Sequence, residues 1–151
     1  MSYTGSKAQS GRGTKVSISA AIASPTYTEI GEAKSAPLSG STWNTDDVSN
    51  FDSGIDEEFI TTMRAPGEPT ITGNRVSSDA GQVIVDTVYN SGALAAFQVL
   101  LPKTAAQTST GDAYTFTALI ISREFPIEAN KTVTFSLKLK ISGPVTFTAG
   151  T

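Results

Sequence analysis

The segment from Thr132 to Ser142, TVTFSLKLKIS, alternates apolar and polar residues without a break. Its apolar positions are Val133, Phe135, Leu137, Leu139 and Ile141. Because successive side chains of a β-strand point to opposite faces of the sheet, this pattern predicts one long strand with one buried and one solvated face. At about 3.3 Å per residue, the strand spans roughly 30 Å. The polar face carries Thr, Ser and Lys, which suit bulk solvent, a ligand or the inside of a channel.

Shorter runs predict further strands and one helix. The expected strands are 14–22, 27–30, 70–76, 95–101, 113–122 and 145–148, with 56–63 as either a strand or a short amphipathic turn. The helix is expected over 78–90, with Ser78 as N-cap and Gly92 as the stop signal. About seven strands and one helix indicate a mainly β fold, an antiparallel β-sandwich or open barrel with one flanking α-helix.

The 151 residues are enough for one domain with a sizeable core. Residues 1–13 are polar and rich in Gly and Ser, which predicts a flexible N-terminal arm, or an arm that orders against a neighbour in an assembly. Residues 14–151 form the single β domain. The connection at 32–55 shows no sustained period and is long for a compact domain. Its isolated apolar residues, among them Trp43, Val48 and Phe51, indicate that it packs on something, which can be a partner chain.

Composition makes an enzyme the least expected class. The chain has no His and no Cys, which removes the commonest general base, the serine triad and thiolate metal sites. We therefore expect no catalytic residue, no metal and no cofactor. The net charge of −3 argues against nucleic-acid binding through phosphate neutralisation. No apolar run approaches the ~18 residues of a membrane-spanning helix, so no membrane partner is expected.

The densest charged cluster contains six acids: Asp46, Asp47, Asp52, Asp56, Glu57 and Glu58. It can be aligned with an EF-hand calcium loop over 46–57, but the alignment fails. Val48 falls where a ligand oxygen is needed, and Phe51 falls where the sharp turn requires Gly. A solvated acidic loop is therefore the favoured interpretation.

Taken in order, several segments resemble the major tail tube protein of long-tailed, siphovirus-type bacteriophages. They are DDVSNFDSGIDEEFITTM at 46–63, GEPTITGN at 67–74, AAFQVLLP at 95–102, DAYTFTALIIS at 112–122 and TVTFSLKLKISGPVTF at 132–147. The resemblance covers roughly 14–148 and rests on the ordered set rather than on one motif. The chain departs from the family at Thr62-Met63, where relatives often carry Gly-Leu.

The resemblance implies a structural virion protein without enzymatic activity. In the family, six copies form a ring with one continuous β-barrel, and the rings stack into a hollow tube that delivers the genome into the host cell. Such a protein is assembled in the host cytoplasm and located in the virion tail. Its partners are further copies of itself, the tape measure protein, and the tail terminator and tip proteins. DNA passes through without specific binding, so we expect a net-negative lumen.

The resemblance also implies interface residues. Subunit contacts are expected at Trp43, Asp46, Asp47, Val48, Phe51 and Asp52, and arm contacts between rings at Lys7 and Arg12. Lys138 and Lys140 fit poorly in a lumen that repels phosphate, so we expect neighbouring acids to neutralise them, or an outward position. Two other readings stay open: a carbohydrate- or protein-binding β-sandwich of adhesin or lectin type, and the tube of a contractile injection or secretion system.

Overall fold

A computed structural model describes residues 8–38 and 40–151. Lys7 lies outside the described residues. The described part contains ten strands and one helix. They are β1 Lys15–Ser19, β2 Thr28–Glu29, β3 Ala33–Ser35, β4 Thr42–Asp47, β5 Phe59–Ala65, β6 Thr70–Asn74, α1 Ala80–Ser91, β7 Ala95–Leu100, β8 Ala113–Glu124, β9 Thr134–Ile141 and β10 Thr146–Thr148.

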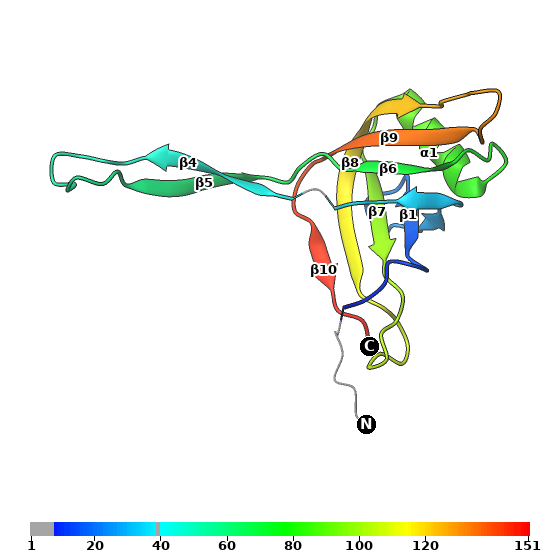
Figure 1. Ribbon diagram of the computed structural model, residues 1–151, viewed down its shortest axis with the longest axis horizontal. Coiled ribbons are helices and arrows are strands. Elements are labelled where there is room, and N and C mark those ends of the chain that lie inside the picture. The colour runs from blue at the N-terminus through cyan, green and yellow to red at the C-terminus, as the bar shows by residue number, and fades with distance from the viewer. Residues whose placement is uncertain (1–7, 39) are drawn as a thin grey trace.

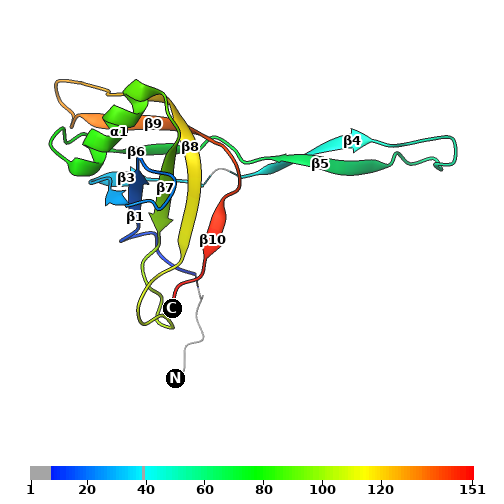
Figure 2. The ribbon, with the colours of Figure 1, turned by 180° about the vertical axis from the view of Figure 1, so that it is seen from behind.

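Eight strands form one curled antiparallel sheet in the order β2-β1-β7-β8-β9-β6-β3, with β10 paired to β8 beyond the end of β9. The helix α1 packs against β1, β2 and β8 on one side of this sheet (Figure 2). β4 and β5 form a separate two-stranded sheet that projects from the rest of the molecule (Figure 1). The predicted fold class, a mainly β open barrel with one flanking helix, is confirmed.

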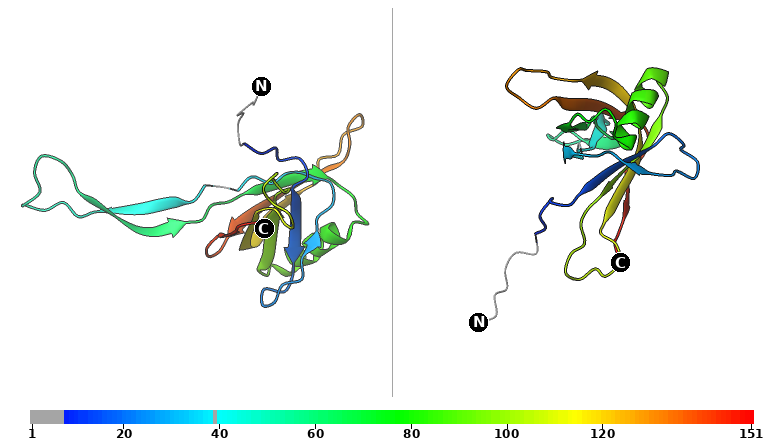
Figure 3. Two further views of the ribbon diagram at one scale, coloured as in Figure 1. Left: turned by 90° about the horizontal axis from the view of Figure 1, so that it is seen from below. Right: turned by 90° about the vertical axis from the view of Figure 1, so that its right-hand side faces the viewer.

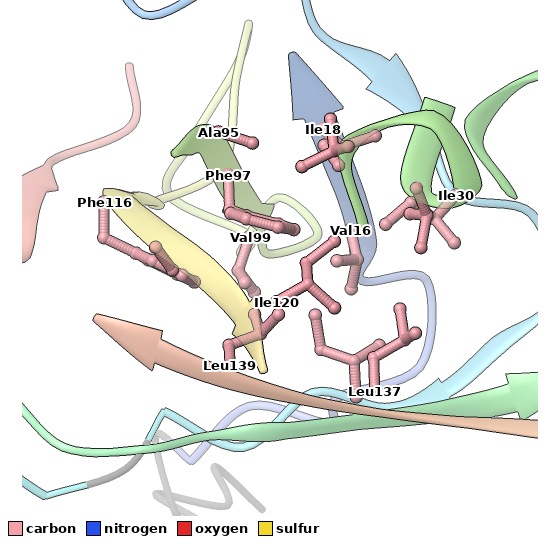
Figure 4. Close-up of a cluster of buried hydrophobic side chains, with 14 of the residues drawn as sticks. Val16, Ile18, Ile30, Ala95, Phe97, Val99, Phe116, Ile120, Leu137 and Leu139 are labelled. Atoms are coloured by element: carbon pink, nitrogen blue, oxygen red, sulfur yellow. The ribbon is translucent and has the colours of Figure 1, made fainter. Parts of the chain in front are cut away.

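The core is built on β9, as its alternation predicts. Phe135, Leu137, Leu139 and Ile141 are buried, whereas Lys138 and Lys140 between them are exposed. The apolar face of β9 meets side chains from β1, β7 and β8 (Figure 4). Within this core the rings of Phe97 and Phe116 stack with centroids 5.6 Å apart.

A β-bulge divides the longest strand, β8, into two parts. Its register against β9 shifts between Ile120 and Ser122, so Ile121 has no partner on β9. The extra residue reverses the alternation, because Ile120 is buried before the bulge and Arg123 turns to the helix side after it. Arg123 there forms an ion pair with Asp86 of α1 at 2.7 Å, and Arg75 joins the same carboxylate at 2.9 Å.

The predicted helix is present, but its N-cap is Asp79 rather than Ser78. The Asp79 carboxylate accepts from the backbone N–H groups of Gln82, at 3.1 Å, and of Gly31, at 3.0 Å. Asp79 is the N-cap because its carboxylate also binds the Gly31 N–H, in the segment that follows β2. The buried Gln82 side chain completes the link by donating to the carbonyls of Gly31 and Asn74. Gly92 ends the helix in the left-handed conformation, as predicted.

The prediction of an irregular connection over 32–55 is wrong, since it contains β3 and β4. β4 is exposed along its whole length, and so is its partner β5. A strand without a buried face is under no selection for alternating apolar residues, so periodicity does not reveal it. For 56–63, the strand alternative is correct, with β5 beginning at Phe59. No helix in the described part of the chain has the length and apolar character needed to cross a membrane.

Gly81 tests the packing of α1. In a helix interior Gly→Ala usually stabilises a protein by up to about 1 kcal/mol. At Gly81 a Cβ would overlap the Glu29 carbonyl oxygen and lie 2.6 Å from Ile30 Cα. We therefore expect Gly81→Ala to destabilise the fold by about 1–3 kcal/mol in chemical denaturation. Val83→Ala, at an exposed position of the same helix, is the control and should change stability by less than about 0.5 kcal/mol.

Candidate functional site

The β4–β5 hairpin is the least compact feature of the molecule. With its tip at 48–58 it extends away from the curled sheet (Figure 1 and the left view of Figure 3). Its two strands pair with each other and with no strand of the larger sheet in the described residues. An isolated two-stranded hairpin is marginally stable at best in water. The hairpin therefore needs a partner surface to be well ordered.

The hairpin carries most of the exposed large apolar side chains. Phe51 and Ile55 at the tip are as exposed as in an extended chain, at 109% and 102%, and Met63 on β5 is 78% exposed. The full set on this segment is Trp43, Val48, Phe51, Ile55, Phe59, Ile60 and Met63. Apolar side chains gathered in this way mark interaction sites rather than ordinary surface.

The tip is acidic and locally ordered. Asp47 accepts a hydrogen bond from the Ser49 N–H at 2.8 Å, and the Ser53 hydroxyl donates to Glu58 at 2.8 Å. The hydrogen bonds from Ser49 lower the pKa of Asp47 below its ordinary value of 3.8. A lowered folded-state pKa means that the Asp47 carboxylate supports the turn above that ordinary value, and that this support is lost as the pH falls through the folded pKa.

The hairpin is strongly acidic. Residues 42–65 hold the six acids of the cluster and one base, Arg64, for a net charge of −5. The Arg64 guanidinium lies 5.5 Å from the centroid of the Trp43 ring, which fixes both side chains on one face. No group of three or more His, Cys, Asp or Glu side chains within 8–38 and 40–151 is placed to hold a metal ion.

The structure brings the sequence-predicted interface residues together on the hairpin. Trp43, Asp46 and Asp47 lie on β4, and Val48, Phe51 and Asp52 lie in the tip. Sequence reasoning included β5 as one alternative for 56–63 but did not assign Phe59, Ile60 and Met63 of this strand to the same surface. The signal for these three residues was their place in the 56–63 run, which directly follows the acidic tip in the sequence.

The face of the large sheet that points away from the buried core is polar. Thr134, Ser136, Lys138 and Lys140 of β9 share this face with Thr70 and Thr72 of β6, as the pairing of Thr70 with Lys138 shows. Lys138 forms an ion pair with Glu68 at 3.4 Å. The expectation that an acid neutralises Lys138 is confirmed. Lys140 forms no ion pair within 4.0 Å in the described residues, so its outward position stays a prediction.

A groove of about 520 Å³ opens at the end of the sheet away from the helix. Its lining includes Leu101, Tyr114 and the 36–38 segment, with the buried Val16 and Val99 beneath them. The charged residues that line it are Arg12 and Lys34. Arg12, an expected arm contact, therefore lies on the body of the domain.

The chain exposes more surface than a compact monomer does. Its accessible area is 9917 Å², whereas a compact 15.7 kDa protein exposes roughly 7,300 Å². The difference exceeds the ~1,600 Å² buried in a standard protein–protein interface. The hairpin, which is exposed along both strands, is the described part that departs most from compactness.

No protein-family model and no curated protein matches this sequence. Among solved structures, a chain in the C6-symmetric tail of an empty GTA particle superposes with a TM-score of 0.73 at 18% identity, over 94% of this chain and 100% of that chain. A chain in the sixfold-symmetrised baseplate of the anti-feeding prophage gives 0.71 at 12% identity, over 96% and 97%. The SPP1 tail tube gives 0.67 at 18% identity, over 91% and 77%. At these identities the likeness establishes a shared fold.

Hydrogen exchange tests whether the hairpin is ordered in the monomer. In dilute protein, amides of β4 and β5 should exchange close to the unfolded rate, whereas those of β9 should be strongly protected by the buried core. Raising the protein concentration should protect β4 and β5 selectively, because association buries them. Strong protection of β4 and β5 in a dilute monomer, verified by light scattering, would contradict the need for a partner.

Proposed function

We propose that this chain is the structural subunit of a hollow tail tube in a phage or phage-like particle. One observation carries the proposal. The fold matches chains of tail assemblies over nearly the whole length of both partners, and the domain leaves a long acidic and apolar hairpin without a partner. A binding module needs one receptive surface, whereas a tube subunit needs surfaces that meet further copies of itself.

The proposed assembly is a ring of six copies. The sixfold symmetry of two structural neighbours supports this number. The large sheet is curled and antiparallel, and its two outermost strands, β2 and β3, have only two and three residues. Sheets of adjacent copies joined edge to edge would form one continuous β-barrel, which removes the exposed edges and leaves an open channel at this strand number.

The hairpin is the proposed contact between copies. Trp43, Val48 and Phe51 supply apolar area, and Asp46, Asp47 and Asp52 supply charge that selects a basic partner surface. Arg12 is proposed as a contact of the N-terminal arm, and Lys7 is retained with it from the sequence alone. Ile55, Phe59 and Met63 join this set from the structure.

The long-tailed, siphovirus-type assignment is the finer proposal. It is supported by the ordered sequence resemblance and by the similarity to the SPP1 tail tube. The tube of a contractile injection system is the second candidate, favoured by the match to the anti-feeding prophage baseplate chain. In either particle, the proposed location is the tail, with assembly in the host cytoplasm. The proposed partners are a tape measure protein and terminator and tip proteins, with DNA passing through unbound in the phage.

Negative-stain microscopy of the purified protein at high concentration tests the proposal. We expect rings or hollow tubes. Phe51→Asp combined with Ile55→Asp should reduce assembly while leaving the β9 core folded, because both side chains lie in solvent in the monomer. Ile127→Asp, at an exposed apolar site outside the hairpin, is the matched control. A dispersed monomer that binds a glycan array would overturn the proposal in favour of an adhesin-like module.

DNA binding gives an independent check. A net-negative protein with Lys138 neutralised by Glu68 should not retain the phosphate backbone. Assembled tubes should bind duplex DNA more weakly than the ~10⁻⁴–10⁻⁶ M typical of non-specific binding at physiological salt. Fluorescence anisotropy with a labelled duplex measures this, with a basic DNA-binding protein as the positive control. Micromolar or tighter retention by tubes would contradict an unbound passage of DNA.

A further inference from the structure

The bulge in β8 lies close to the point where this strand changes partners. Residues 113–118 of β8 pair with β7, whereas residues 118–124 pair with β9. The inserted residue, Ile121, is 43% exposed, so burial of its side chain does not explain the insertion. Because a bulge leaves one residue unpaired and disrupts the ladder locally, another interaction has to favour it.

A continuous pairing of β8 with β9 is the direct competitor of the bulge. If the register that precedes the bulge simply continued, Arg123 would lie opposite Ser136 rather than opposite Leu137. Directly opposite residues share a face of the sheet, and Leu137 lies on the buried face. The continuous pairing would therefore move Arg123 away from the helix to the polar face, and would add a second cation next to Lys138.

In the observed register, Arg123 takes part in a cluster of charged and aromatic side chains between the helix and the sheet. The Asp86 carboxylate of α1 accepts a hydrogen bond from Arg123 at 2.7 Å and one from Arg75, which follows β6, at 2.9 Å. The Arg123 guanidinium also lies 4.6 Å from the ring centroid of Tyr89 and 5.1 Å from that of Phe125. The side chain of Asp86 is only 26% exposed, so these charge-assisted bonds are screened less than those of a fully exposed pair.

We propose that the ion pair between Asp86 and Arg123 selects the bulged register of β8 over the continuous one. The carboxylate can bind Arg123 when Ile121 is left out of the ladder, since the inserted residue turns Arg123 to the helix side. Because a bulge bends its strand and increases the local twist, the same ion pair fixes the bend between the two parts of β8. This selection operates within one folded chain and is independent of the proposed tube function.

Disulfide trapping can read the register, because the chain contains no Cys. Glu124 lies opposite Ser136 in the bulged register, whereas in the continuous register the two residues would be offset and on different faces. Opposite residues of antiparallel strands have Cα atoms roughly 4.5–5.5 Å apart, a distance that a disulfide can span. Glu124→Cys with Ser136→Cys should therefore form a disulfide under mild oxidation, measured as the loss of free thiols in the denatured protein. We call this disulfide the diagnostic cross-link.

The matched control is Leu119→Cys with Lys140→Cys, a pair that precedes the bulge. Its residues are opposite each other in both registers, so its disulfide should form whichever register the second part of β8 adopts. Loss of the control cross-link reports unfolding of the sheet rather than a change of register.

Asp86→Asn removes the charge of the carboxylate and nearly preserves its shape. We expect this change to reduce the yield of the diagnostic cross-link about tenfold while the control cross-link still forms. A tenfold change corresponds to about 1.4 kcal/mol, which is close to the contribution of one hydrogen bond to a charged group. If the diagnostic cross-link forms undiminished in the Asp86→Asn chain, the ion pair does not select the register.

Deletion of Ile121 separates the selection of a register from general stability. Without this residue, positions 122–124 keep their partners at 136–138 in a continuous ladder, so the pairing no longer depends on Asp86. We therefore expect the deletion to restore the diagnostic cross-link in the Asp86→Asn chain, even if Asp86→Asn alone is too unstable to give either cross-link. If the deletion restores nothing, Asp86 acts on the stability of the whole fold and the proposal is overturned.

Discussion

The large sheet depends on the burial of every second side chain of β9. This strand pairs with β8 on one side and β6 on the other, and its apolar face supplies Leu137 and Leu139 to the centre of the core. A shift of one residue in register would place Lys138 and Lys140 in that core, and the desolvation of two charged side chains opposes such a shift. The alternation therefore fixes the register of both neighbouring strands and defines the polar face at the same time.

The large sheet buries its apolar face within a single chain, whereas both strands of the hairpin remain exposed. All of β4 and β5 is exposed, and the apolar side chains they carry are not among the residues of the buried core. In water this segment gains little from folding alone, because its ordering entropy is not offset by burial. Its local bonds, from Ser49 to Asp47 and from Ser53 to Glu58, hold the tip in shape without burying it. Association with another surface would therefore have to order the two strands as well as bury them, and the burial of their apolar side chains would offset that entropic cost.

Sequence reasoning succeeded where one face of an element is buried and failed where burial is absent or irregular. β9, β7 and α1 can be predicted from the sequence because packing against the core requires apolar residues at regular positions along them. β4 has no buried face and therefore no period. Because Ile120 and Ile121 are adjacent, the sequence around the bulge suggests a strand with apolar residues on both faces. Only the pairing with β9 shows that Ile121 is an inserted residue. Asp79 displaced Ser78 as N-cap because of its bond to Gly31, a contact 48 residues away that no local pattern encodes.

The distribution of charge favours head-to-tail association. The 42–65 segment has a net charge of −5 within a chain of net charge −3, so the remaining residues sum to +2. Two hairpins placed side by side would bring their acids together, and like charges at short range oppose that contact. A hairpin placed on the body of another copy is attracted instead. Symmetric pairing would end at a dimer, whereas hairpin-to-body pairing repeats and closes only as a ring or extends as a stack. Through this asymmetry, the charge distribution of a single chain suits the repeating assembly proposed for it.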